Sequence, residues 1–170
     1  IAEITDFMPI LTEDVPNQLI RFVHVVQGEI TFKLECWPRF DYARRKHTVE
    51  RRHDDVVFRP EGKGIPPMVL KASIPLEVHG DGVEMTFSLK EGENRVFLFS
   101  EDCPETDKPL DEALLKQRFD DTARYWRTWA GKSRYTGRWR EMISRSALVL
   151  KLMTDQEHGS IIAAPTFGLP

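Results

Sequence analysis

The hydrophobic pattern of the chain changes its period near residue 105, and this change constrains the fold more than any other feature. Residues 83–90 alternate strictly between apolar and polar side chains, and the segments 29–36 and 68–74 repeat the alternation. A period of two is expected where one face of a sheet meets a core and the other meets water. The pattern therefore predicts β-strands over residues 1 to about 100.

Two further segments, 19–26 and 96–99, are apolar on both faces, which is typical of central strands. Glycine-containing turn signals separate the predicted strands, at 27–28, 62–64, 80–82 and 91–94. Many short strands joined by tight turns, without helices between them, indicate a mainly β fold. We predict an antiparallel β-sandwich.

From about residue 109 the apolar side chains recur every three or four positions, as on one face of a helix. They are Leu115, Phe119, Ala123, Trp126 and Trp129. Pro109 is compatible with a first helical turn, and Gly131 is a plausible end of the helix. A second helix is predicted over 136–153.

The second helix is apolar on two sides. Its main stripe consists of Trp139, Met142, Ile143, Ala147 and Leu150, and Leu148 and Leu152 add another face. A helix appended to a sandwich buries one stripe, so the second face needs a cover of its own. We infer that other helices, which this chain does not encode, pack on residues 138–153. We also expect the chain alone to aggregate or to form a homo-oligomer through this helix.

Composition excludes several function classes. The 170 residues contain 24 Lys and Arg against 27 Asp and Glu, a net charge of −3, which argues against a nucleic-acid partner. The segment 116–141 is locally basic and rich in aromatics, but its tryptophans follow the helical stripe, so we interpret the basic residues as a solvated face. Lys151 ends the apolar run 147–150, so no membrane helix is expected.

No targeting segment is visible at the start of the chain, which has neither a basic beginning nor an apolar core, and we expect a cytoplasmic protein. The chain also lacks an initiator methionine and stops abruptly at Leu169-Pro170. We therefore expect it to be a piece of a longer protein.

The residues that carry most enzyme chemistry do not form a recognisable site. No metal-ligand spacing joins the histidines, and no nucleophile elbow, phosphate loop or cofactor motif is present. We interpret His24 as a core residue and the other histidines as solvated: His47, His53, His79 and His158. Adjacent acids at 54–55, 101–102 and 120–121 point in different directions, so we expect solvated charge rather than an acid/base pair.

The two cysteines are too few for a disulfide framework. Cys36 lies in an alternating strand pattern, and we interpret it as a small buried apolar residue. A single bridge between Cys36 and Cys103 stays open at this point.

Several motifs resemble one known family, the bacterial glucoamylase/trehalase-like enzymes of glycoside hydrolase family fifteen. The resemblance is most specific in the block 137–170 and extends to shorter motifs near the start of the chain. The matching segments are 5–9 (TDFMP), 38–42 (PRFDY), 125–129 (YWRTW), 137–141 (GRWRE), 145–154 (RSALVLKLMT), 159–166 (GSIIAAPT) and 169–170.

The resemblance implies an N-terminal β-sandwich over residues 1–105 with its first strands missing, and a linker helix within 106–136. It implies that residues 137–170 begin an (α/α)6 catalytic barrel. The family hydrolyses α-linked glucosides, such as trehalose or starch-like glucans, with inversion and two glutamic acids. Neither glutamate has a match here, so we expect no catalytic residue and no activity in this chain. Ala164, Pro165 and Thr166 would be adjacent to the sugar pocket.

A stand-alone sandwich module that binds carbohydrate or a protein partner is the alternative. In that case Trp37, Phe40 and Tyr42 could form an exposed stacking platform. Exposure of these three rings would favour the module, whereas an uncovered 138–153 helix would favour the truncated barrel.

Overall fold

A computed structural model describes residues 1–10, 17–103, 107–155 and 157–164. Within these residues the chain divides into two compact units, Ile1–Phe119 and Asp120–Pro170. The boundary lies inside helix α1 (Glu112–Ala130), and each unit is described by itself.

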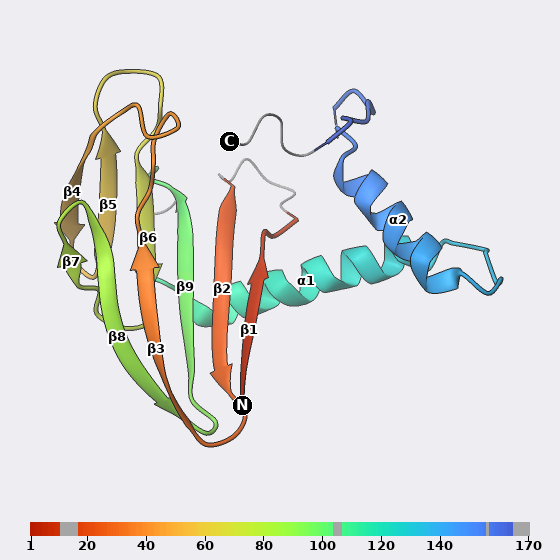
Figure 1. Cartoon of the computed structure of the whole chain (residues 1–170), viewed down its shortest axis with the longest axis horizontal. Coiled ribbons are helices and arrows are strands. Elements are labelled where there is room, and N and C mark those ends of the chain that lie inside the picture. Colours follow the sequence, from red (N-terminus) through yellow and green to blue (C-terminus); the bar gives the residue numbers. More distant parts are fainter. Residues whose placement is uncertain (11–16, 104–106, 156, 165–170) are drawn as a thin grey trace. The chain divides into compact units, whose positions relative to one another are not determined.

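The first unit contains two antiparallel sheets, as the sequence predicts (Figure 1). The larger sheet has the order β1 (Ala2–Phe7), β2 (Gln18–Val25), β9 (Asn94–Glu101), β6 (Met68–Ala72), β5 (Asp55–Pro60), β4 (His47–Arg52). The smaller sheet has the order β3 (Glu29–Cys36), β8 (Gly82–Lys90), β7 (Val78–His79). The fold of this unit is therefore mainly β.

The core lies between the two sheets. From the larger sheet, Phe58 and Leu70 pack with Val83 of β8, and the rest of this cluster surrounds them. A second cluster joins Val25 of β2 to Leu89 of β8. Three of these side chains, those of Phe58, Val83 and Leu89, are completely buried. The alternation at 83–90 therefore marks the core face of β8, as predicted.

Strands β2 and β9 are buried on both faces, which confirms them as central strands. Their second face packs on the start of α1, where Ile20, Val96 and Leu98 contact Leu115. Only 3% of Leu115 is exposed. The ring of Phe119 adds an edge contact to Phe7, with 5.3 Å between centroids. The first turns of α1 thus belong to the sandwich.

Local sequence signals explain both ends of α1. Leu114 donates its backbone N–H to the Asp111 carboxylate at 3.0 Å, so Asp111 caps the helix. Pro109 stands just before this cap, outside the helix, where its missing N–H costs nothing. At the other end, Gly131 donates its N–H to the Arg127 carbonyl at 2.9 Å.

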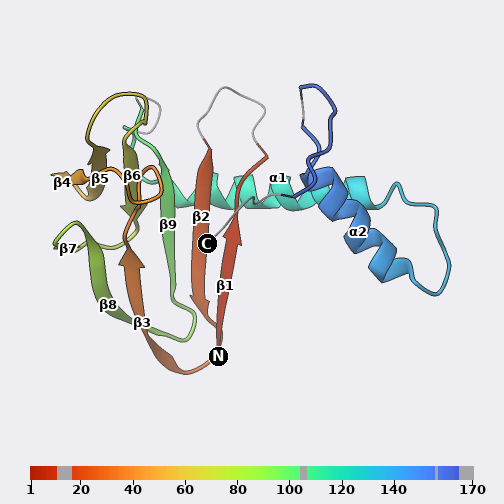
Figure 2. The same cartoon turned by 45° about the horizontal axis from the view of Figure 1, so that its top comes forward.

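In the second unit, helix α2 spans Arg140–Leu152, a shorter range than predicted. Trp139 precedes it with φ −99° and ψ 25° and makes no side-chain capping hydrogen bond. After α2 the chain turns back, and Thr154 and Ile161 form an isolated antiparallel bridge. Figure 2 shows this return, which includes the predicted turn at 158–159.

The smaller sheet leaves part of the larger one uncovered. Ile4 of β1 pairs with Val23 of β2, so its side chain is on the face that meets the smaller sheet. Ile4 is nevertheless 57% exposed, and Leu19, farther along β2 on the same face, is 44% exposed. Because β3 is the last described strand of its sheet, no strand of the smaller sheet faces this end of the larger one, whose other face packs on α1.

Candidate functional site

The candidate pocket residues of the sequence analysis are only partly described. Ala164 is exposed and belongs to no helix or strand. Pro165 and Thr166 lie outside the described residues. Just before Ala164, Ile162 donates its N–H to the Met153 carbonyl at 3.1 Å, which ties this segment to the end of α2. The role proposed for these three residues stays a prediction.

Helix α2 carries the main uncovered apolar surface of the second unit. None of its residues is buried. The exposed large side chains are those of Trp139 (54%), Met142 (62%), Ile143 (38%), Val149 (53%), Leu150 (50%) and Leu152 (70%). We call these six residues the α2 apolar surface. It includes members of both predicted faces, so a polypeptide that covers it must reach two sides of the helix.

Trp139 does not take the position expected from the helical stripe. The sequence places it in the interior of the second helix, whereas the structure places it at the residue before α2. Its ring contacts the Arg138 guanidinium, which is 5.0 Å from the ring centroid. Trp139 is therefore an exposed part of the α2 apolar surface and not a core residue of this chain.

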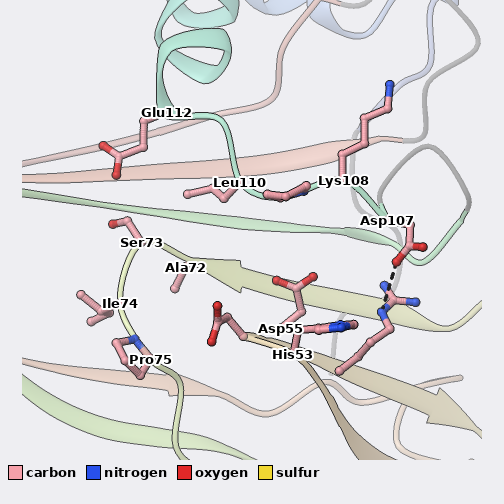
Figure 3. Close-up of a pocket in the computed structure, with 13 residues that line it drawn as sticks. His53, Asp55, Ala72, Ser73, Ile74, Pro75, Asp107, Lys108, Leu110 and Glu112 are labelled. Carbon is pink, nitrogen blue, oxygen red and sulfur yellow. Dashed lines mark ion pairs between the residues drawn. The ribbon is translucent and has the colours of Figure 1, made fainter.

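A pocket of about 680 Å³ lies in the sandwich beside the segment that leads into α1 (Figure 3). Three segments line it: the β4–β5 turn at 52–55, the segment 72–75 after β6, and the segment 107–112 before α1. Charged side chains dominate its rim, so its chemistry depends on how these charges are paired.

Ion pairs engage three of the charged residues that line this pocket, Arg52, Asp55 and Asp107. Lys71, whose side chain is 3% exposed, binds the Asp55 carboxylate and donates to the Lys108 carbonyl at 2.9 Å. Arg52 binds Asp102 at 2.7 Å and Asp107 at 3.6 Å. These bonds attach the segment before α1 to the larger sheet. The pocket is thus a joint between segments of the sandwich.

The prediction that the adjacent acids are solvated holds for the exposed Asp54, Asp120 and Asp121 but is wrong for Asp55 and Asp102. Only 7% of the Asp102 side chain is exposed, and it accepts hydrogen bonds from both Arg52 and Arg59. Asp55 is likewise mostly buried beside Lys71. Both acids lie next to basic residues in space, although 16 residues separate Asp55 from Lys71 and 50 separate Arg52 from Asp102. Sequence adjacency could not reveal these partners.

The aromatic platform of the alternative hypothesis does not form. Phe40 is only 7% exposed and belongs to the main core cluster. Trp37 is half-buried, and its ring meets His79 edge to face. Tyr42 is 82% exposed. The three rings therefore do not share one exposed surface, because Phe40 packs into the core between the sheets.

Two histidines differ from the expectation: His24, expected in the core, is only half-buried on β2, and His47 is not solvated. His47 is half-buried between Phe40 and Phe58, and its Nε2 lies 2.7 Å from the Asp81 carbonyl oxygen. It was predicted to be solvated. Among the described residues, no group of three or more His, Cys, Asp or Glu side chains could hold a metal ion.

Neither cysteine forms a disulfide, and Cys36 is the small core residue that its strand pattern predicts. Burial raises the pKa of the Cys36 thiol to about 11 from a usual value of 9.0. The thiol therefore stays protonated and unreactive at neutral pH.

The raised pKa of Cys36 predicts a pH dependence of stability. The unfolded chain loses the thiol proton near pH 9 and the folded chain near pH 11, so the unfolding free energy should fall as pH rises through this window. The slope is at most about 1.4 kcal/mol per pH unit. Urea denaturation of the wild type and Cys36→Ala at pH 8, 9, 10 and 11 measures it. An identical slope in both proteins would contradict the assignment, and Cys103→Ala is the control.

Taken together, the sandwich and the uncovered α2 apolar surface are typical of one part of a larger multidomain protein. Within the described part of the chain, no helix is long and apolar enough to cross a membrane. No protein-family model and no solved structure matches the chain.

Curated trehalases do match it. Over its whole length the chain is 26% identical to a trehalase of Thermoplasma acidophilum and to one of Thermoplasma volcanium. It is 28% identical, over 92% of its length, to a trehalase of Mycobacterium tuberculosis. The chain spans only 29%, 27% and 24% of these three proteins. It is therefore similar to a small part of each.

Proposed function

We propose that the chain is the N-terminal structural portion of a longer trehalase-like glycoside hydrolase. Its sandwich supports the catalytic part, and the α2 apolar surface packs against helices of that part. The exposure of all six residues of the α2 apolar surface carries this proposal, since an apolar surface of this kind is buried in a finished fold. The match to trehalases about three to four times as long agrees with it.

The proposed domain limits follow the resemblance. Residues 1–105 form the sandwich, 106–136 hold the linker helix, and 137–170 begin an (α/α)6 barrel whose other helices cover α2. The end of the larger sheet that no strand of the smaller sheet faces supports the proposal that the first strands of the sandwich are missing from this chain. Additional strands beside β3 would extend the smaller sheet and cover the exposed side chains of Ile4 and Leu19.

The proposed chemistry resides outside this chain. In the longer protein, one glutamic acid protonates the leaving oxygen and another activates water, with inversion at the glucosidic carbon. Trehalose is the substrate we propose, because the matching relatives are trehalases. Starch-like glucans and maltooligosaccharides are the alternative substrates of the family. Ala164, Pro165 and Thr166 would lie beside the sugar pocket without a catalytic role.

Glucose release tests this proposal. The full-length protein should release glucose from trehalose faster than from maltotriose, and residues 1–170 alone should release none. Faster glucose release from maltotriose would contradict trehalose as the substrate and would indicate a glucoamylase-like enzyme. Release by residues 1–170 alone would contradict the structural role, because this chain should lack both catalytic glutamates.

A further inference from the structure

A left-handed turn at the end of the sandwich has an unusual backbone. Asp41, Tyr42 and Ala43 have φ angles of 50°, 56° and 64°. For residues other than glycine, a left-handed position is sterically strained, because Cβ approaches the following carbonyl oxygen. Three in succession persist only where neighbouring contacts hold them, and backbone of this kind is concentrated at functional sites.

Strong contacts hold this turn from both sides. Phe40, immediately before it, is buried in the main core cluster. The Arg45 guanidinium, two residues after it, donates to the Glu61 carbonyl at 3.3 Å and to the Lys63 carbonyl at 2.9 Å. Asp41 accepts a further hydrogen bond from Arg44 at 2.8 Å. The turn is therefore rigid before any partner arrives.

The side chain at the centre of the turn is the most exposed large apolar residue of the described chain. Tyr42 is 82% exposed. One side of its ring faces the Arg44 guanidinium, 5.7 Å from the ring centroid, and the turn presents the rest of the ring to solvent. A tyrosine on a rigid support loses little conformational entropy on binding, and for this reason tyrosine is frequent among the residues that dominate interface energies.

A basic hollow lies beside this turn. Its volume is about 620 Å³, and it is lined by Arg44, Arg45, Lys46, Glu61, Gly62 and Lys63. Within the described residues, Lys46 and Lys63 take part in no salt bridge, unlike Arg44 and Arg45, which pair with Asp41. The hollow therefore offers two unpaired ammonium groups next to an exposed aromatic ring.

We propose that Tyr42, Lys46 and Lys63 form a docking surface for an acidic segment in the remaining part of the longer polypeptide. This inference rests on the proposed function, because the occupant belongs to the proposed catalytic part. Carboxylates of the segment pair with Lys46 and Lys63, and an apolar side chain of the segment packs on the free part of the Tyr42 ring. A sugar ring is a poorer occupant, because the neighbouring Phe40 is buried and Tyr42 offers a single exposed ring.

Hydroxyl-radical labelling of the full-length protein tests this docking. Tyr42 should be labelled roughly tenfold more slowly than a free tyrosine peptide, since docking buries its ring. In the double variant Lys46→Glu/Lys63→Glu, labelling of Tyr42 should rise severalfold, because like charges now meet the acidic segment. Lys90→Glu, an exposed charge reversal at the far end of β8, should leave the labelling unchanged.

Three results would overturn the docking surface. They are wild-type labelling at the rate of the free peptide, protection that appears only on addition of trehalose, and protection that is lost on dilution. Protection that requires trehalose would identify a sugar site, and protection lost on dilution would identify a contact between copies of the protein. Glucose release measured on the same samples keeps the two proposals separable. A full-length protein without trehalose hydrolysis but with a protected Tyr42 contradicts the proposed function alone.

Discussion

Replacement of Leu152 by aspartate is expected to have opposite effects in the short chain and in the full-length protein. In residues 1–170, Leu152 is 70% exposed, so Leu152→Asp should leave the unfolding free energy unchanged and reduce self-association. The proposed packing covers the same position in the full-length protein, where a buried aspartate without a partner should destabilise the fold by at least about 3 kcal/mol. Sedimentation velocity and urea denaturation measure the two effects.

A polar position on the same helix provides the control. The Arg145 side chain is 81% exposed and pairs with Glu141 only at 4.0 Å. Arg145→Glu should therefore change the unfolding free energy by less than about 1 kcal/mol in both proteins. Equal stability of full-length Leu152→Asp and the wild type would show that this face of α2 stays in solvent, contrary to the proposed packing.

The second large effect is expected at Lys71. Lys71→Ala removes the partner of Asp55, whose side chain is 19% exposed, and also the donor to the Lys108 carbonyl. Loss of one member of a buried ion pair typically costs about 3–5 kcal/mol, because the other charge remains without compensation. Urea denaturation should show a loss of this size, and the segment before α1 should become more accessible to proteolysis.

Two further variants separate the charge from the packing. In Lys71→Met/Asp55→Leu both charges are replaced by apolar groups, so most of the lost stability should return. Lys33→Met removes a cation from an exposed pair, where the Lys33 side chain is 51% exposed, and should leave the unfolding free energy nearly unchanged. If Lys71→Ala is as mild as Lys33→Met, the pair does not attach the 107–112 segment to the sheet.

The strands with one clear apolar face were predictable from sequence. Apolar and polar residues alternate along strand β8, because its core residues meet the opposite sheet and its other residues meet water. Strands β4 and β5 were missed, since the charged residues between 50 and 55 resemble a loop. Strand β1 was missed as well, because its exposed Ile4 disturbs the alternation that a covered strand would show.

The candidate site could be predicted only in part, because its charged residues pair with partners far away in the sequence. The two apolar faces of the second helix could be predicted, because they depend only on helical spacing. The partners of Asp55 and Asp102 could not, since the fold brings them together from distant strands. The left-handed turn around Tyr42 was also hidden, because no glycine occupies its positive-φ positions.

Amide hydrogen exchange of residues 140–152 tests the central claim most directly, because it reports whether α2 is covered in the full-length protein. We expect these amides to exchange at least about 100-fold more slowly in the full-length protein than in residues 1–170, as the α2 apolar surface becomes buried. Equal exchange rates in the two proteins would contradict the account, because α2 would then lack the cover that its exposed apolar residues require.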